Sequence, residues 1–231
     1  MAIYAISDLH LSFNENKPMS IFGTCWKNHE EKIRKNWIEN ISEEDLVLLP
    51  GDFSWSMYLK DTYKDFEYLN SLPGKKLLLR GNHDYWWTTI TSMRNYLKEN
   101  NFEKIDFIHN NSFEYGNYII AGTRGWVLNG VDQENQKIYR REVERLKISL
   151  NDAVNKYGKE KDIIVCMHYP PIKKNENSEF LNIMVQYNVK KCIYGHLHGT
   201  SQSEVIEGII SGIEFKMVSC DYTEFKLIKI F

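Results

Sequence analysis

KKLLLRGNHD, at residues 75–84, shows most clearly how this chain is organised. Lys75–Arg80 is a short run with the apolar centre Leu77–Leu79 and has the length expected for a buried strand. Gly81 follows it, and glycine lets the backbone turn sharply and approach a site closely. The polar residues Asn82, His83 and Asp84 come next. The stretch therefore predicts a strand that ends in side chains able to bind a ligand.

The same arrangement occurs on both sides of this stretch. Further strands are predicted at Ala2–Ser7, Asp45–Pro50, Asp162–Met167 and, shorter, Lys191–Tyr194. They are followed by Ser7-Asp8-Leu9-His10, Gly51-Asp52, His168-Tyr169-Pro170-Pro171 and Gly195-His196-Leu197-His198. Loops at the carboxyl ends of strands converge in open α/β sheets, so we expect these polar residues to meet.

Helix-length amphipathic segments separate many of the strands. They are predicted at residues 28–41, 60–71, 88–99, 137–157 and 178–187. Gly116-Asn117 is a hairpin signal between Ser112–Tyr115 and Tyr118–Gly122. The last part of the chain predicts antiparallel strands at Val205–Ile210, Ile213–Cys220 and Phe225–Ile230. With no repeat or linker, the pattern indicates an α/β (α+β) fold with mixed sheets and a single domain over residues 1–231.

Composition limits the classes of protein to which the chain can belong. Hydrophobic residues make up 42% and charged residues 26% of the 231 residues, as in an ordinary globular protein. The 29 Lys and Arg against 31 Asp and Glu leave no positive excess, so general nucleic-acid binding is not expected. The first apolar run stops at Asp8, and no run approaches the length of a membrane span. We expect a cytoplasmic protein with no membrane partner, in which Cys166 and Cys192 are buried.

The polar residues at the strand ends form a set of metal donors. They comprise two carboxylates, one amide oxygen and four imidazoles. This set is too large for one tetrahedral zinc, but it suits two cations about 3.5–4 Å apart that share a carboxylate. Mixed nitrogen and oxygen ligation favours manganese, with iron, zinc or cobalt as alternatives. Any one of these short motifs is usually an ordinary turn, and it is their joint order and position that indicate a metal site.

The ordered series Asp-x-His, Gly-Asp, Gly-Asn-His-Asp, His and Gly-His-x-His resembles the calcineurin-like metallophosphoesterase superfamily, with a match from Asp8 to His198. The resemblance implies a four-layer fold in which two mixed β-sheets pack as a sandwich flanked by helices. It implies a first cation held by Asp8, His10, Asp52 and His198. It implies a second cation held by Asp52, Asn82, His168 and His196, with Asp52 as the bridge and His83 outside the ligand set.

The predicted reaction is hydrolysis of phosphate mono- or diesters by in-line attack of a metal-bridging hydroxide. His83 is the predicted general acid. Asp84 either orients that imidazole or caps the helix that begins near Thr88. The run Gly51-Asp52-Phe53-Ser54 lacks the second Asp and the Arg of the phosphoprotein phosphatase branch. This departure argues against a Ser/Thr protein phosphatase and leaves the orienting partner of His83 open.

The expected substrate is a small phosphorylated compound such as a nucleotide. Arg124 either holds a phosphate oxygen or is a solvated loop residue. Trp55 and Trp86 either wall a substrate pocket or pack in the core. His29 and His109 belong to no motif and are expected at the surface.

Two other functions compete with this hypothesis. A nuclease or nucleotide pyrophosphatase would use the same site, but the near-neutral charge counts against a long polyanionic substrate. A non-catalytic interaction protein could keep the fold, yet such proteins typically lose ligands or the catalytic His, and here all are in place.

Overall fold

The computed structural model describes residues 1–231 except 16, 129, 131 and 175–177. Its first sheet has five strands in the order β11-β1-β2-β3-β4. The strands are β1 (Ile3–Ala5), β2 (Leu46–Pro50), β3 (Lys75–Leu79), β4 (Ile105–Ile108) and β11 (Ile228–Lys229). β1 to β4 run parallel, and β11 pairs with β1 in the antiparallel direction. The carboxyl ends of the parallel strands therefore lie at one edge.

The second sheet has six strands in the order β5-β6-β7-β8-β10-β9. They are β5 (Phe113–Tyr115), β6 (Tyr118–Thr123), β7 (Asp162–Met167), β8 (Lys191–Tyr194), β9 (Gly208–Ile210) and β10 (Ile213–Met217). β6, β7, β8 and β10 are parallel, while β5 and β9 are antiparallel edge strands. The hairpin predicted at Gly116-Asn117 is confirmed by the pairing of β5 with β6.

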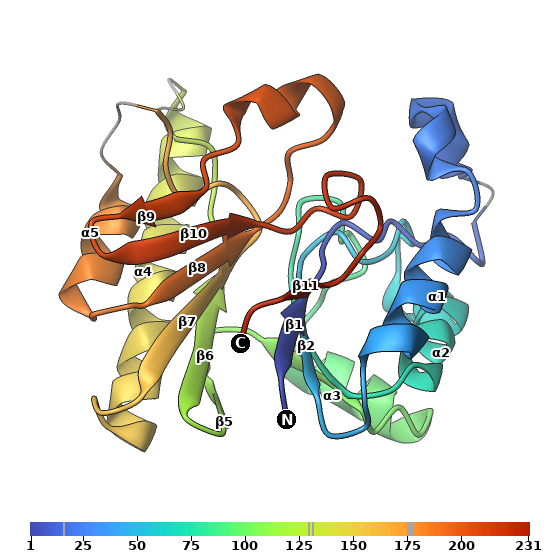
Figure 1. The fold of residues 1–231 in the computed structure, drawn as a ribbon, viewed down its shortest axis with the longest axis horizontal. Coiled ribbons are helices and arrows are strands. Elements are labelled where there is room, and N and C mark those ends of the chain that lie inside the picture. Colours follow the sequence, from blue (N-terminus) through green and yellow to red (C-terminus); the bar gives the residue numbers. More distant parts are fainter. Residues whose placement is uncertain (16, 129, 131, 175–177) are drawn as a thin grey trace.

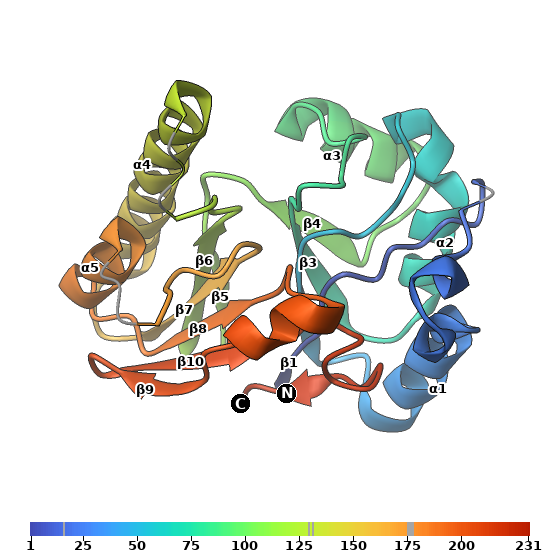
Figure 2. The ribbon, with the colours of Figure 1, turned by 90° about the horizontal axis from the view of Figure 1, so that it is seen from above.

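Helices cover the outer face of each sheet, as Figures 1 and 2 show. α1 (His29–Asn40), α2 (Tyr63–Ser71) and α3 (Ile90–Glu99) lie on the first sheet, and α4 (Gln133–Tyr157) and α5 (Glu179–Gln186) lie on the second. Short 3₁₀ helices are present at Met19–Phe22, Thr24–Trp26, Leu59–Thr62 and Gly199–Glu204. The predicted sandwich of two mixed sheets between helices is confirmed.

Alternation along the strands produces these layers. In β2, Val47 and Leu49 pack against the helices, whereas Leu46 and Leu48 join the cluster between the two sheets. Side chains of consecutive strand residues point to opposite faces, so a strand that is apolar throughout can be buried on both sides. The predicted burial of Cys166 and Cys192 is confirmed, and they lie on opposite faces of the second sheet.

Capping residues set the helix starts. Thr89 accepts a hydrogen bond from the backbone N–H of Ser92, so the helix predicted from residue 88 begins at Ile90. Asp132 accepts one from the N–H of Asn135, and the helix predicted from residue 137 therefore begins four residues earlier, at Gln133. The alternative that Asp84 caps this third helix is wrong, because Thr89 does so.

The C-terminal strands are shorter than predicted. β9 begins at Gly208, three residues after the predicted start, and β10 ends at Met217, where the chain turns toward Asp8. β10 is also parallel to β8, so the prediction of purely antiparallel strands is wrong there. Phe225 has a left-handed φ of 61° and cannot start a strand. β4 was not predicted, since its four residues include the charged Asp106.

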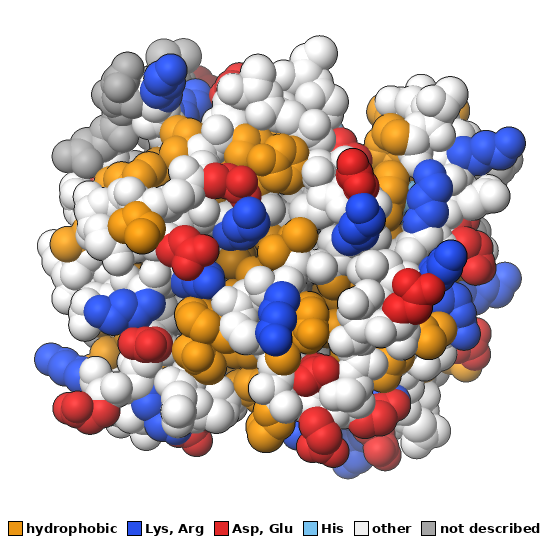
Figure 3. All heavy atoms as spheres, viewed as in Figure 1, with side chains coloured by type: hydrophobic (Ala, Val, Ile, Leu, Met, Phe, Trp, Pro, Cys, Tyr) orange, Lys and Arg blue, Asp and Glu red, His pale blue; other side chains and the backbone are white. Residues whose placement is uncertain are grey.

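The distribution of charge on the surface and the polarity of the helices are relevant to nucleic-acid and membrane partners. Lys, Arg, Asp and Glu side chains are interspersed over the face shown in Figure 3. Within the described residues, the helices are all too short or too polar to span a lipid bilayer.

Candidate metal centre

Strand ends from both sheets meet at one place. Asp8 and His10 follow β1, Asp52 follows β2, Asn82 follows β3, His168 follows β7, and His196 and His198 follow β8. The backbone N–H of His196 donates to both Asp8 carboxylate oxygens, at 3.3 and 3.1 Å. The two sheets therefore bring together all seven donors that the sequence predicted.

Two overlapping clusters of donors can be distinguished. Asp8, His10 and His198 each offer a ligand atom within 4.8 Å of the others, and so do Asp8, Asp52 and His168. The first cluster lies within the set that the resemblance implies for one cation. The second adds Asp8 to two members of the other set. The donors thus form one continuous centre rather than two isolated sites.

Asp52 lies between the two sides of this centre. Its Oδ2 is 3.8 Å from His10 Nε2 and 3.5 Å from His168 Nε2. Its Oδ1 accepts a hydrogen bond from the backbone N–H of His83 at 2.8 Å. One carboxylate oxygen therefore faces a histidine from each sheet, while the other is held by the protein.

The hydrogen bonds of His168 leave a lone pair pointing into the centre. Its Nδ1–H donates to the carbonyl of Pro50 at 3.0 Å, and burial lowers its pKa to about 3, so the ring is neutral. Its Nε2 then carries a lone pair that lies 2.7 Å from Asn82 Oδ1 and 3.3 Å from His196 Nδ1. The convergence of this imidazole lone pair with the Asn82 amide oxygen suits a cation, which can satisfy both together.

The charges of the buried carboxylates also favour a cation. Burial raises the pKa of Asp52, and the neighbouring Asp8 charge raises it further. Burial also opposes the charge of Asp8, but His198, His168 and His10 together outweigh burial and lower the Asp8 pKa. The carboxylates of Asp8 and Asp221 raise the pKa of His198 to about 10 against the effect of burial. A divalent cation would stabilise both carboxylates in the charged form.

Four of the seven donors have strained backbones. Asp8, His10, Asp52 and His196 have φ values of 60°, 46°, 53° and 75°. Residues other than glycine rarely adopt this left-handed region, and each such residue costs about 1–3 kcal/mol. Strain of this kind persists where the surrounding fold enforces it, typically at functional sites. The fold therefore holds these four residues in an unfavourable backbone conformation that places their side chains at the centre.

Glycines permit the close approach that the sequence predicted. A Cβ on Gly81 would lie 2.0 Å from Asp52 Oδ1, and one on Gly195 would lie 2.4 Å from Asp8 Oδ2. Contacts under 3.0 Å are not tolerated between such atoms. The two carboxylates can thus occupy their positions only because these residues lack side chains.

His83 stands beside the donors without joining them. Its ring centroid is 4.7 Å from that of Trp55 and 5.7 Å from that of His10. Trp55 itself stacks on His10 at 4.8 Å with an interplanar angle of 22°. Burial lowers the pKa of the half-buried His83. The imidazole is therefore held at the edge of the centre by aromatic packing.

Asp84 binds backbone groups of the two neighbouring loops. Its oxygens accept hydrogen bonds from the N–H groups of Gly81, Asp52, Phe53 and Ser54 and from the indole of Trp86. These five bonds fix the Asp52 loop against the His83 loop. The partners of this carboxylate are the backbone around the centre and a buried tryptophan.

Asp221 is a residue of the centre that the motifs did not reveal. Its Oδ1 accepts from His198 Nδ1 at 2.7 Å, and its Oδ2 accepts from Gln202 Nε2 at 2.9 Å. The side chain is only 7% exposed. It follows no glycine and lies 23 residues beyond His198, so no spacing rule connects the two. Such a carboxylate fixes the orientation of a metal-binding imidazole, and here it directs Nε2 toward the centre, 3.1 Å from Asp8 Oδ1.

The structure decides between the alternatives given for some flanking residues and corrects the expectation for His29. Trp86 is fully buried in the core rather than lining a pocket, and His29 is buried with its Nε2 2.9 Å from Leu9 O. His109 is half-buried. The side chain of Arg124 is only 10% exposed, with its guanidinium 4.5 Å from the Trp126 ring centre, so it is not a solvated loop residue.

Comparison with known proteins identifies the family of the chain. The model of the calcineurin-like phosphoesterase family matches residues 1–200. The fold and the donor set thus define a metallophosphoesterase domain, and the chain belongs to the calcineurin-like phosphoesterase family. Among curated proteins, none gives a significant match.

Solved structures share the fold at low sequence identity. The phosphopantetheinyl hydrolase of Mycobacterium tuberculosis is 13% identical with a TM-score of 0.61, over 100% of this chain and 95% of its own. TT1561 of Thermus thermophilus is 15% identical with a TM-score of 0.61, over 98% and 96% of the two chains. AQ665 of Aquifex aeolicus, a protein of unknown function, is 20% identical with a TM-score of 0.52, over 99% and 95%. These similarities concern the fold alone.

Proposed function

We propose that this protein is a metal-dependent phosphoesterase that hydrolyses phosphate mono- or diesters at a binuclear centre. The ligands would be Asp8, His10, Asp52, Asn82, His168, His196 and His198. The observation that carries the proposal is the position of Asp52 Oδ2, 3.8 Å from His10 Nε2 and 3.5 Å from His168 Nε2. One oxygen in this position can serve two cations. Nitrogen and oxygen donors without a thiolate favour manganese, or iron, zinc or cobalt.

The bound cations would supply the nucleophile and the charge stabilisation. When bound, two such ions lower the pKa of a water that they share and neutralise the phosphoryl oxygens. Within the chain, His168 Nδ1 donates to Pro50 and His198 Nδ1 donates to Asp221, so both rings present Nε2 to the centre. The hydrogen bond from His83 N–H to Asp52 Oδ1 holds the shared carboxylate in place.

His83 would act as the general acid. Its Nδ1 is buried without a hydrogen-bond partner among the described residues, and such an atom calls for an explanation. We propose that the imidazole gives its proton to the leaving oxygen of the bound ester, with Trp55 and His10 holding the ring in place. Asp84 would assist indirectly, by fixing the two loops that carry Asp52 and His83.

The test is hydrolysis of p-nitrophenyl phosphate and bis-p-nitrophenyl phosphate by metal-stripped protein with and without added Mn²⁺. We expect turnover only with the metal, and the preferred ester separates a monoesterase from a diesterase. Two bound ions per chain with no turnover of either ester would favour the non-catalytic alternative. Addition of Zn²⁺, Co²⁺ or Fe²⁺ in parallel identifies the metal that gives the highest rate.

The expected substrate is a small phosphate compound. The chain has a formal charge of −2, and the face in Figure 3 carries both charge signs without a continuous basic stripe. Polyanions need such a stripe to bind along their length. Arg124, which lies against Trp126 and 3.6 Å from Glu142, is a candidate contact for a phosphate oxygen.

A further inference from the structure

An apolar cavity opens directly beside the metal centre. It has a volume of about 160 Å³, and its walls include Trp126, Leu128, Tyr169, Ile172, His196 and Leu197. His196 is one of the seven donors, so this cavity and the centre share a wall. The ring of Tyr169 packs on that of His196 with centroids 4.1 Å apart, and Trp126 packs on Tyr169 at 5.0 Å. A row of aromatic rings thus leads away from the metals.

The chemistry of this cavity differs from that of the centre. Most of its wall is apolar, and among the described residues that line it the charged and imidazole side chains are His196, at the metal end, Lys173 and Glu204. A polar or charged group that entered the apolar part would lose water without gaining partners. An apolar cavity of about 150 Å³ can hold benzene, so this one is large enough for a single ring.

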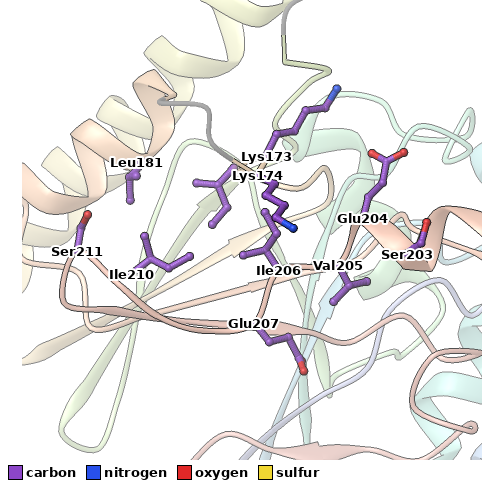
Figure 4. Close-up of a pocket in the computed structure, with 11 residues that line it drawn as sticks. Lys173, Lys174, Leu181, Ser203, Glu204, Val205, Ile206, Glu207, Ile210 and Ser211 are labelled. Carbon is purple, nitrogen blue, oxygen red and sulfur yellow. The ribbon is translucent and has the colours of Figure 1, made fainter.

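The cavity continues into a larger groove. Ile172, Lys173 and Glu204 line both, and the groove has a volume of about 830 Å³. Figure 4 shows Leu181 and Ile210 at one end of the groove, Glu204 and Val205 at the other, and Lys173 and Lys174 between them. A group longer than one ring would therefore leave the cavity along an open path rather than meet a closed wall.

We propose that the cavity binds an apolar substituent of the substrate, so that this protein prefers phosphate esters that carry an aromatic or similarly bulky apolar group next to the phosphate. The inference rests on the proposed function, because it is the metal centre that would hold the phosphate. The aromatic residues of the cavity wall, Trp126 and Tyr169, lie in the loops after β6 and β7 of the second sheet. His83 and Trp55 instead lie in loops of the first sheet, so the cavity wall and the proposed general acid come from different sheets.

Two phosphonates that cannot be hydrolysed test the cavity directly. Benzylphosphonate and methylphosphonate carry the same charged group and differ only in the apolar substituent. We expect the Mn²⁺-loaded protein to bind benzylphosphonate at least about tenfold more tightly, since burial of one ring removes it from water. Competition with p-nitrophenyl ester hydrolysis measures both affinities. Quenching of Trp126 fluorescence by benzylphosphonate, reduced in Trp126→Phe, measures binding without turnover.

Matched variants connect the preference to this wall. Leu128→Trp fills the cavity and is expected to reduce the preference for benzylphosphonate to less than about threefold, with methylphosphonate binding unchanged. Ile148→Trp makes a similar change on the exposed face of α4, where Ile148 is 50% exposed, and should keep the preference. If Leu128→Trp does not fold, Trp126→Ala, which removes one wall, is expected to lose the preference instead.

The outcomes separate the two proposals. Absence of turnover on every ester despite bound metal would overturn the proposed function. Turnover with equal affinity for the two phosphonates would overturn the cavity assignment and leave the phosphoesterase intact. A preference that survives Leu128→Trp in folded protein would also overturn it.

Discussion

Asp221→Asn is expected to weaken Mn²⁺ binding about tenfold. Asp221 Oδ1 accepts the hydrogen of His198 Nδ1 at 2.7 Å, in a position where its side chain is 7% exposed. An asparagine oxygen can accept the same hydrogen bond, but the substitution removes the negative charge that makes the imidazole a better electron-pair donor to a cation. Loss of such a partner typically reduces metal affinity about 10- to 100-fold, and the amide should fall at the lower end. Tenfold corresponds to about 1.4 kcal/mol.

Asp221→Ala removes the orientation as well as the charge. His198 then has no carboxylate on Nδ1, and the hydrogen bond from Gln202 to Asp221 Oδ2 at 2.9 Å is lost too. We expect a loss of affinity near 100-fold, about 2.7 kcal/mol. The graded series from Asp to Asn to Ala therefore separates the contribution of charge from that of geometry.

Isothermal titration of metal-stripped protein with Mn²⁺ measures both variants. Asp152→Asn is the matched control, because Asp152 is a partly exposed carboxylate on α4 that pairs with Lys156 at 2.9 Å. The Mn²⁺ affinity of this control variant should equal that of the wild type. Circular dichroism checks that each variant is folded. Wild-type affinity in folded Asp221→Ala would refute the assigned role of this carboxylate.

Four further changes have defined outcomes. Asp52→Asn should reduce both Mn²⁺ stoichiometry and turnover severely, and wild-type values in titration and kinetics would contradict the shared-ligand role. His83→Ala should keep two ions but lower kcat about 10²- to 10⁴-fold, so an unchanged kcat would exclude it as the general acid. Gly81→Ala should lower the free energy of unfolding by about 1–3 kcal/mol in urea melts, because its Cβ would lie 2.0 Å from Asp52 Oδ1. Wild-type stability would show that the loop can move freely. Burial lowers the pKa of Lys76 to about 7, below its value in the unfolded chain. The buried ammonium therefore destabilises the fold fully below about pH 7, and stability is regained as pH rises from 7 toward about 10.5, where the side chain is neutral in both states. Lys76→Met should therefore gain most over the wild type below about pH 7 and progressively less above it; a gain that does not vary with pH in urea melts would argue against this.

Much of the fold follows from local features of the chain. Apolar runs within residues 75–80 and 162–167 predict buried strands because nearly every residue of a strand must be apolar when both faces of its sheet are covered. The polar residues after those runs also predict where donors converge, since parallel strands end at one edge. Short strands were harder to recognise, as β4 shows: Asp106 interrupts its apolar pattern and binds Arg94 at the surface.

The position of single side chains depends on contacts between distant parts of the chain. Asp221 meets His198 only because β10 runs parallel to β8, and this pairing was not apparent from the segments themselves. His29 is buried because α1 packs it against Leu9, although its own neighbours are polar.

The residue types and their order along the chain were thus sufficient to indicate the family and the strand ends and to predict seven candidate metal donors, because local periodicity and turn chemistry act over a few residues. Tertiary packing alone decided which oxygen of Asp52 faces the histidines, which carboxylate orients His198 and where an apolar cavity lies beside the candidate metal centre. These features arise where loops of the two sheets, which are distant from each other in the sequence, pack together. Their free energies come from burial and charge interactions that no short segment contains.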